Sequence, residues 1–273
     1  MIDPTPASSS PLPPVQDHHI FVGWDPGENM AHVIACQSIR YNAVRAPQIR
    51  RLALAELQAR MMYTRPIEKH AAPDGGPAML YDPISQAPMS TEHAIARFFV
   101  PWYQQYKGWA LFVDGDIMCR HDIGDLFALA DPKYAVMVVK HPPILDTSPK
   151  KGGMVQLPYE RKNWSSVMLF NCAHMANRQL GDIVLNSFPG RDLHRFCWLK
   201  DEEIGELPPT WNHLVNVSAP VPDPQGPALV HFTLGIPTIV PSGTVYDSEW
   251  YRHGQMAGYT YAVPTAHTNG SAA

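Results

Sequence analysis

The feature that most constrains the fold is a run of five apolar residues in mid-chain, Trp109 to Val113, which ends directly at Asp114-Gly115-Asp116. A strand without polar residues is typical of a sheet that is buried on both faces, as parallel sheets are. Parallel strands are joined by crossover connections, which are usually helices. The run therefore predicts an α/β fold in which helices cover both faces of the sheet.

Further apolar segments of strand length alternate with segments of helical spacing, as in α/β folds. A helix is predicted from Asn29 to Tyr41, and another begins near Ser90-Thr91, where a hydroxyl can cap it. We predict one domain over residues 18–262, with a mostly parallel central sheet flanked by helices, between a Pro/Ser-rich tail at 1–17 and a second tail at 263–273. The other predicted strands are 19–23, 49–54, 134–139, 167–170 and 228–232.

The composition excludes several classes of protein. With 21 basic and 25 acidic residues the net charge is −4, which argues against a nucleic-acid binder that relies on bulk positive charge. Four cysteines without a CxxC spacing exclude a zinc knuckle and a thioredoxin motif, so we expect free thiols. No apolar run reaches the roughly 18 residues of a membrane span, and the N-terminus lacks the apolar core of a signal peptide. We therefore expect a cytoplasmic protein, either free in solution or peripheral to the inner membrane.

Asp114 and Asp116 stand at the predicted end of the buried strand. In open α/β sheets, ligands bind outside the carboxyl ends of the strands. Two carboxylates placed there repel each other unless a cation lies between them or one is protonated. Their oxygens suit Mg²⁺ or Mn²⁺, which would hold phosphate oxygens, and Gly115 lets the backbone approach a ligand closely. We therefore predict a Mn²⁺ or Mg²⁺ site; the alternative is a turn in which Asp caps the following helix.

An Asp-x-Asp pattern after an apolar strand has two common meanings. In haloacid-dehalogenase-like phosphotransferases it contains an aspartyl nucleophile, lies near the N-terminus and continues to Thr or Val. Here Met118 occupies that position, and the pattern lies in mid-chain. In A-type glycosyltransferases, the same pattern binds the metal that carries a nucleotide sugar. The segments on either side favour the second meaning.

From about Ile20 to about Tyr251 the sequence resembles bacterial family-eight-like glycosyltransferases with the A-type (GT-A) fold, especially members that begin with a Y/W-D-P motif. Each matching segment is weak alone, but six occur in the expected order. The resemblance implies a single GT-A-like domain that transfers a sugar from a nucleotide-sugar donor, such as a UDP-sugar, to a saccharide or other hydroxyl-bearing acceptor. The matching segments are FVGWDP (21–26), MSTEHAIARFFVP (89–101), LFVDGDI (111–117), RKNWSSVMLFN (161–171), WLKDEEIGELPPTWN (198–212) and HFTLGIPT (231–238).

The resemblance also implies where the donor binds. Trp24 would stack on the nucleotide, and Asp25 would accept a hydrogen bond from the uracil or the ribose; the alternative for Asp25 is an ordinary turn. Arg97 would reach the phosphates or the sugar, because a guanidinium forms paired bonds to oxyanions. Its alternative is a surface position on an amphipathic helix. Asp114 would contact the donor as well as the metal, and Gly235 would let the backbone turn around the pyrophosphate.

In this family a histidine at the place of His231 is the third metal ligand beside the two aspartates, and neutral imidazole suits Mn²⁺. The alternative is an ordinary core or turn histidine. Many relatives follow this histidine with a lysine for the phosphate, whereas the segment HFTLGIPT has none. Lys162, or Arg161 before it, would then supply the missing positive charge.

The resemblance also implies roles for two further segments, one in binding the sugar and one in catalysis. The hydroxyls of Ser165 and Ser166 would bond sugar hydroxyls; the alternative is a strand start that binds nothing. Asp201, Glu202 and Glu203 lie near the place where the family has an acidic or amide residue facing the reacting sugar. We take Asp201 and Glu202 as the catalytic candidates, against the alternative of a solvated helix start.

The sequence is therefore predicted to encode a metal-dependent, retaining glycosyltransferase. The alternatives are a nucleotidyltransferase that makes nucleotide sugars and a non-catalytic sugar- or nucleotide-binding protein. A nucleotidyltransferase needs a basic, Gly-rich loop after the first strand, and the segment from Gly23 to Glu28 contains no Lys or Arg. The Pro/Gly/Lys-rich stretch from His141 to Arg161 is predicted to be a lid that orders over the bound donor; the alternative is an inert surface loop.

Overall fold

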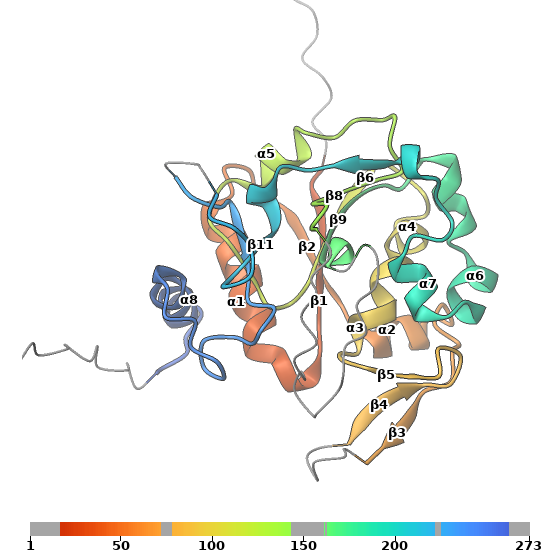
Figure 1. The fold of residues 1–273 in the computed structure, drawn as a ribbon, viewed down its shortest axis with the longest axis horizontal. Helices are drawn as coiled ribbons and strands as arrows, with labels where there is room; N and C mark the ends of the chain where they lie inside the picture. The colour runs from red at the N-terminus through yellow and green to blue at the C-terminus, as the bar shows by residue number, and fades with distance from the viewer. Residues whose placement is uncertain (1–16, 72–77, 143–160, 162, 222–224, 262–273) are drawn as a thin grey trace, which may run out of the picture.

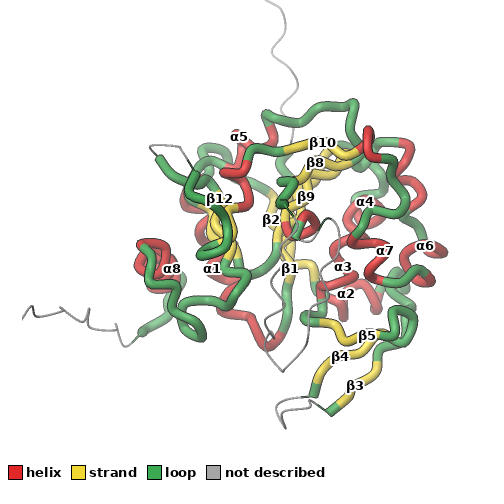
Figure 2. The backbone as a smooth tube through the Cα atoms, in the orientation of Figure 1, coloured by secondary structure: helices red, strands yellow, loops and turns green. Residues whose placement is uncertain are grey.

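The computed structural model describes residues 17–71, 78–142, 161, 163–221 and 225–261, so nearly all of the predicted tails and lid lie outside it. Six strands form a central sheet: β1 (His19–Gly23), β2 (Gln48–Leu52), β6 (Trp109–Val113), β8 (Val136–Val138), β9 (Val167–Asn171) and β10 (Ile204–Glu206). Their order is β10-β8-β9-β6-β1-β2. Figures 1 and 2 show this sheet in the middle of the molecule, between its covering helices. All neighbours pair in parallel except β9, which is antiparallel to both β6 and β8. The predicted α/β fold with a mostly parallel central sheet is confirmed.

Side chains alternate between two cores, one on each face of this sheet. In β6, Ala110 and Phe112 face the first core, Leu111 and Val113 face the second, and all four are fully buried. Because both faces are covered, the strand carries no polar residue. Figure 1 shows the covering helices on opposite sides of the sheet. The first core packs against α2 (Leu54–Ala59), α3 (His93–Ala96), α4 (Val100–Tyr103), α6 (Asp182–Ser187) and α7 (Gly190–His194), and the second against α1 (Asn29–Asn42) and α5 (Ile123–Phe127).

The helix predicted near Ser90-Thr91 begins later and is interrupted. No side-chain hydroxyl caps α3; instead Oδ2 of Asp25, just after β1, accepts a hydrogen bond from the Glu92 backbone N–H at 2.9 Å. Further along, Pro101 lacks the N–H that would bond the carbonyl of Arg97, and a 3-10 turn separates α3 from α4. The start of this helical segment is therefore set by a tertiary contact from the end of β1.

The segment 228–232, expected as one more strand of the mostly parallel sheet, lies in a second sheet. There β12 (Leu229–His231) runs parallel to β11 (His213–Leu214) and antiparallel to β7 (Ile117–Cys119), with His231 opposite Ile117. An apolar run predicts a strand but not its partner, which is why the sequence did not separate the two sheets. Because β7 directly follows Asp116, this pairing brings His231 next to that residue.

A third apolar core joins the second sheet to the C-terminal helix α8 (Val245–Met256). It contains Ile34 from α1, Met118 from β7, Val230 from β12 and Trp250 from α8, all fully buried. None of the described helices is long and apolar enough to cross a membrane. The four cysteines are free, as predicted.

A small antiparallel sheet that the sequence did not predict lies beside α2 and α3 (Figure 1). Its Asp82 forms an ion pair with Arg65, and both side chains are fully buried. Nη1 of Arg65 also donates to the carbonyls of Leu185 (2.9 Å) and Phe188 (2.8 Å), which anchors the sheet to α6. The strands are β3 (Glu68–His70), β4 (Met79–Asp82) and β5 (Ala87–Met89).

Candidate metal centre

Five of the six central strands point the same way, because β6 and β8 are both antiparallel to β9 while the remaining pairs are parallel. Their carboxyl ends therefore lie along one edge of the sheet, where ligands bind in open α/β folds. Trp24 follows β1 at this edge, Asp114 follows β6, and His141 comes shortly after β8. The antiparallel strand β9 begins at the same edge, which adds Ser165 and Ser166 to it.

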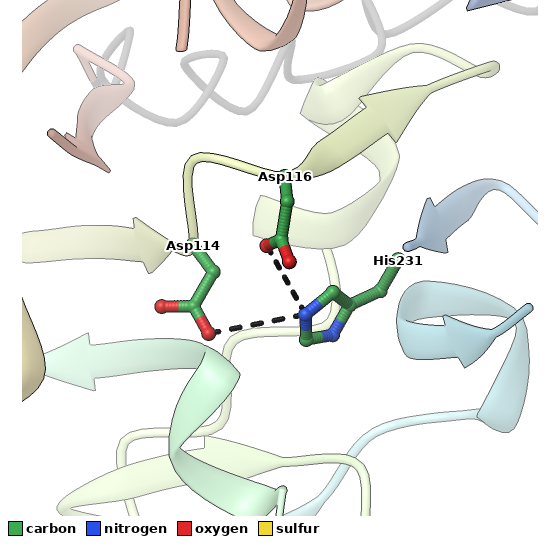
Figure 3. A group of neighbouring side chains, drawn as sticks. All are labelled: Asp114, Asp116 and His231. Carbon is green, nitrogen blue, oxygen red and sulfur yellow. Dashed lines mark ion pairs between the residues drawn. The ribbon is translucent and has the colours of Figure 1, made fainter. Parts of the chain in front are cut away.

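Asp114, Asp116 and His231 converge at this edge, with the imidazole turned toward both carboxylates (Figure 3). Nε2 of His231 lies 3.2 Å from Oδ1 of Asp116 and 4.0 Å from Oδ2 of Asp114. One ligand atom from each residue lies within 4.8 Å of the others. The imidazole is buried, whereas a quarter of the Asp116 side chain, 25%, is exposed. The turn between β6 and β7 and the strand β12 thus bring the three predicted ligands together.

Close packing around the aspartate turn requires two glycines. A Cβ atom at Gly115 would lie 2.7 Å from the carbonyl oxygen of Gly23, closer than side-chain carbons approach backbone atoms. A Cβ atom at Gly23 would lie 2.6 Å from the ring of His93. Any side chain at either position would push the aspartate turn, the end of β1 and His93 apart.

Two basic side chains from the helical segment before β6 hold Asp114. Nη2 of Arg97 lies 2.8 Å from Oδ1 of Asp114, and Nη1 lies 3.3 Å from Oδ2. Nε2 of His93 lies 3.3 Å from Oδ1. Nη1 of Arg97 also donates to the carbonyl of Ser165 at 2.9 Å. Arg97, predicted to reach the donor, therefore contacts a candidate metal ligand directly.

Burial by itself would raise the pKa of both carboxyl groups, but neighbouring basic groups outweigh it. The pKa of Asp114 is lowered against its burial, chiefly by Arg97 and then by His93 and His231. The pKa of Asp116 is lowered against its burial by His231, although the charge of Asp114 opposes that shift. Both carboxylates are therefore ionised at neutral pH, and a divalent cation would neutralise the pair.

The donor atoms at this centre fit Mn²⁺ or Mg²⁺. Carboxylate oxygens suit hard divalent ions, and one imidazole nitrogen suits Mn²⁺ in particular. The cluster contains no thiolate, which a site for softer metals would use. An ion held by Asp114, Asp116 and His231 would also be reached from solvent along the partly exposed side of Asp116.

Ser165 and Ser166 lie next to Asp114, whose backbone N–H donates to the carbonyl of Ser166 at 2.9 Å. Each is 3% exposed, and both hydroxyls bond to protein groups. Oγ of Ser165 lies 2.7 Å from Nδ1 of His194, and Oγ of Ser166 donates to the carbonyl of Asn163 at 2.7 Å and accepts from Nδ2 of Asn212 at 2.9 Å. Contact of these hydroxyls with a sugar stays a prediction.

Trp24 and Asp25 lie in the turn that follows β1. Nε1 of Trp24 donates to Oδ1 of Asn29 at 2.9 Å, and the guanidinium carbon of Arg51 lies 4.8 Å from the indole centroid. Oδ1 of Asp25 accepts from the N–H of Gly27 at 2.8 Å, while Oδ2 holds the start of α3. Asp25 therefore has the turn role that was its alternative, and its contact with a base or ribose stays a prediction.

Among the residues that the structure describes, Gly235, Asp201 and Glu202 take no part in this network. Gly235, in the loop after β12, has a φ of 127°, which side chains rarely adopt. Asp201 forms an ion pair with Arg161, Glu202 is exposed, and within the described part of the chain neither contacts the three-residue cluster. Lys162 lies outside the described residues. Catalytic and phosphate-binding roles for these residues stay predictions.

Three residues of the network were not predicted: His93, His194 and Asn212. His93 stands one helical turn before Arg97, so a shared helix face was a signal in the sequence. His194 and Asn212 reach the site from α7 and from the turn after β10. No local pattern marks His194, and the matching segment that ends at Asn212 did not connect that residue with the metal ligands. Their positions depend on tertiary packing alone.

Several solved glycosyltransferases share this fold. The galactosyltransferase LgtC, solved with donor and acceptor sugar analogues, has a TM-score of 0.52 at 15% identity, over 90% of this chain and 98% of LgtC. GlyE of Streptococcus pneumoniae has a TM-score of 0.51 at 12% identity, over 87% of this chain and 61% of GlyE. The bifunctional glycosyltransferase WbbM has 0.50 at 13% identity, over 89% of this chain and 53% of WbbM. The chain thus spans less than two thirds of GlyE and WbbM, and at these identities the likeness shows the fold alone, which is the GT-A fold.

The sequence itself has a clear relative. Protein CDI of Arabidopsis thaliana is 38% identical over 220 residues, which cover 80% of this chain and 78% of that protein. The chain therefore belongs to the same protein family as Protein CDI. No family model matches the chain. The bacterial family-eight-like subgroup that the motifs suggested is not confirmed.

Proposed function

We propose that this protein is a metal-dependent glycosyltransferase that moves a sugar from a nucleotide-sugar donor, in the first instance a UDP-sugar, to a hydroxyl group of a saccharide or other acceptor. The observation that carries the proposal is the convergence of Asp114, Asp116 and His231 at the carboxyl edge of a GT-A sheet. That edge is where open α/β sheets bind ligands. A divalent cation held by these three residues would balance the negative charge of a nucleoside diphosphate leaving group.

In this proposal Asp114, Asp116 and His231 hold Mn²⁺ or Mg²⁺, which would offset the negative charge of the donor diphosphate. Arg97 keeps Asp114 ionised and oriented, because its guanidinium contacts both oxygens of that carboxylate. His93 supports the same carboxylate from the preceding helical turn. In this proposal Arg97 therefore affects donor binding indirectly, because it holds the Asp114 carboxylate that would bind the metal.

We place the nucleoside of the donor at the end of β1. The base would stack on the pair formed by Trp24 and Arg51, since both the indole and the guanidinium present flat faces. Asp25 would bind the ribose or the base. Its two oxygens each accept one backbone hydrogen bond, and each carboxylate oxygen can accept a second.

The proposed reaction retains the anomeric configuration. The bond between the anomeric carbon and the diphosphate oxygen breaks, and the acceptor oxygen bonds to that carbon on the same face. The acceptor proton passes to the leaving diphosphate, through a transition state of oxocarbenium character.

Asp201 and Glu202 remain the proposed carboxylates near the reacting sugar. Gly235 and Lys162 remain the proposed contacts of the diphosphate, and Ser165 and Ser166 those of the sugar.

A panel of UDP- and GDP-sugars, incubated with the protein and Mn²⁺, tests this function by the release of free UDP or GDP. We expect UDP from at least one UDP-sugar, and none with Asp116→Asn as the matched control. Pyrophosphate released from a nucleoside triphosphate and a sugar phosphate would instead indicate a nucleotidyltransferase. Binding without release of either product would indicate a sugar- or nucleotide-binding protein. NMR of the product from an α-linked donor decides the stereochemistry, and a β-linked product would refute retention.

A further inference from the structure

A chain of hydrogen bonds links Asn163, Ser166, Asn212 and His231, and the donor and acceptor of each bond can be assigned. The carbonyl oxygen of Asn163 can only accept, and Oγ of Ser166 donates its single proton to it at 2.7 Å. Oγ of Ser166 must therefore accept from Asn212, whose Nδ2 lies 2.9 Å away. The same Nδ2 lies 3.4 Å from the Asn163 carbonyl oxygen. The amide nitrogen of Asn212 is thus turned toward Ser166, and its oxygen points the other way.

That oxygen faces the imidazole of His231. Oδ1 of Asn212 lies 3.2 Å from Nδ1 of His231. Because an amide oxygen cannot donate, Nδ1 must carry a proton, and in the neutral ring Nε2 then carries the lone pair. Nε2 is the nitrogen that faces Asp116 at 3.2 Å and Asp114 at 4.0 Å (Figure 3). While Nε2 carries a proton it pairs with Asp116; once that proton leaves, the Nε2 lone pair points into the space between the two carboxylates, where a cation would take the place of the proton.

We propose that Asn212 is a positioning residue of the metal centre, which holds His231 in the tautomer whose Nε2 lone pair would bind a divalent cation. The proposal rests on the metal site of the proposed function. The bonds that carry it are shielded from water, since the exposed fractions are 0% for Asn212, 3% for Ser166 and 4% for His231. Buried hydrogen bonds of this kind are strong because bulk water does not compete for them.

The turn that carries Asn212 is itself fixed to the strand that carries His231. The N–H of Ala228, the residue just before that strand, donates to both the carbonyl (2.9 Å) and Oγ1 (2.8 Å) of Thr210. At the other end of the hydrogen-bond chain, the carbonyl of Ser166 accepts from the N–H of Asp114 at 2.9 Å. The chain from Asn163 to His231 therefore connects both sides of the candidate metal centre.

The test measures Mn²⁺ affinity in variants of the full-length protein by isothermal titration. Asn212→Ala removes the acceptor and is expected to weaken Mn²⁺ binding about 10- to 100-fold, as loss of an outer-shell partner does. Asn212→Asp keeps an oxygen in front of the Nδ1 proton, and its Mn²⁺ affinity should stay within about threefold of wild type. The same variant should melt at a lower temperature, because it buries a charge.

The tautomer provides a readout that a merely structural role would not change. In the metal-free protein at pH 9, ¹⁵N NMR of labelled histidine should show the His231 ring protonated at Nδ1. Asn212→Ala should shift the ring toward the Nε2-protonated form or a mixture, and Asn212→Asp should restore the wild-type signals. His231→Ala identifies those signals by their disappearance.

Asn177 offers a matched control. It is also fully buried and makes three hydrogen bonds, two from Nδ2 to the carbonyls of Ala135 and Asn171 and one to Oδ1 from Trp198. Asn177→Ala should lower the melting temperature and leave Mn²⁺ affinity unchanged. If Asn212→Ala binds Mn²⁺ as Asn177→Ala does, or keeps the wild-type tautomer, the role of Asn212 is overturned while the metal site stands. Absence of Mn²⁺ binding in the wild type would overturn both.

Discussion

Replacing Arg97 with methionine is expected to destabilise the metal-free protein by about 3–5 kcal/mol, the usual cost of removing one partner of a buried ion pair. Arg97 is 6% exposed, and the side chain of Asp114 is 13% exposed, so water screens this pair only weakly. Methionine keeps an unbranched apolar side chain of similar reach but leaves the Asp114 carboxylate without its main cation. His93 lies 3.3 Å from the same carboxylate and would compensate only when protonated.

The loss should depend on pH in a defined direction. In the wild type the pKa of Asp114 lies below its usual range, because Arg97 outweighs the burial that would raise it. Without Arg97, burial should raise this pKa, so that protonation at acid pH relieves the cost of the buried charge. The difference in unfolding free energy between wild type and Arg97→Met should therefore be largest at pH 7 and should shrink toward pH 4.

Urea unfolding in the presence of EDTA, at pH 7 and pH 4, measures both effects. Thermal unfolding gives a second measurement. In a domain of this size 1 kcal/mol of unfolding free energy corresponds to about 2–4 °C in melting temperature, so the melting temperature at pH 7 should fall by roughly 6–20 °C. Arg60→Met is the matched control, because Arg60 pairs with Glu56 at 3.1 Å with side chains 54% and 37% exposed. Such an exposed pair contributes about 0–1 kcal/mol. A loss for Arg97→Met no larger than for this control, or an equal loss at both pH values, would refute the reasoning.

Three further predictions concern the same site. Asp116→Asn removes a ligand charge and should abolish Mn²⁺-dependent UDP binding in isothermal titration without changing the circular dichroism; unchanged affinity would contradict the metal assignment. His231→Ala should weaken Mn²⁺ binding more than folding, whereas a large drop in melting temperature with an unchanged Mn²⁺ titration would indicate a core role. Desolvation lowers the pKa of His194 to about 3 and that of His141 to about 4. Because both folded-state pKa values lie below the unfolded value of about 6.5, the stability present above pH 6.5 should fall by roughly 2 kcal/mol per ring by pH 5, measured by urea unfolding.

The apolar run from Trp109 to Val113 was sufficient to predict a strand buried on both faces. Its apolar composition indicates that it is buried, because a strand covered on both faces has no position for a polar residue. The carboxylates that follow it necessarily stand at the carboxyl end of that strand, so a metal site there could also be predicted locally. The place of His231 beside them was implied only by the resemblance to a family, since nothing near it in sequence points to the aspartates.

Tertiary structure alone decided how the strands combine and what surrounds the candidate metal centre. The apolar pattern of 167–170 is the same whichever way β9 runs, and that of 228–232 is the same in either sheet, so direction and partner required the fold. Asn212 and Ser166 are 46 residues apart, and Asn212 and His231 are 19 apart, yet they share one buried hydrogen-bond chain. Sequence patterns report burial and periodicity, whereas the direction of a hydrogen bond and the charge around a carboxylate depend on atoms that only folding brings within reach.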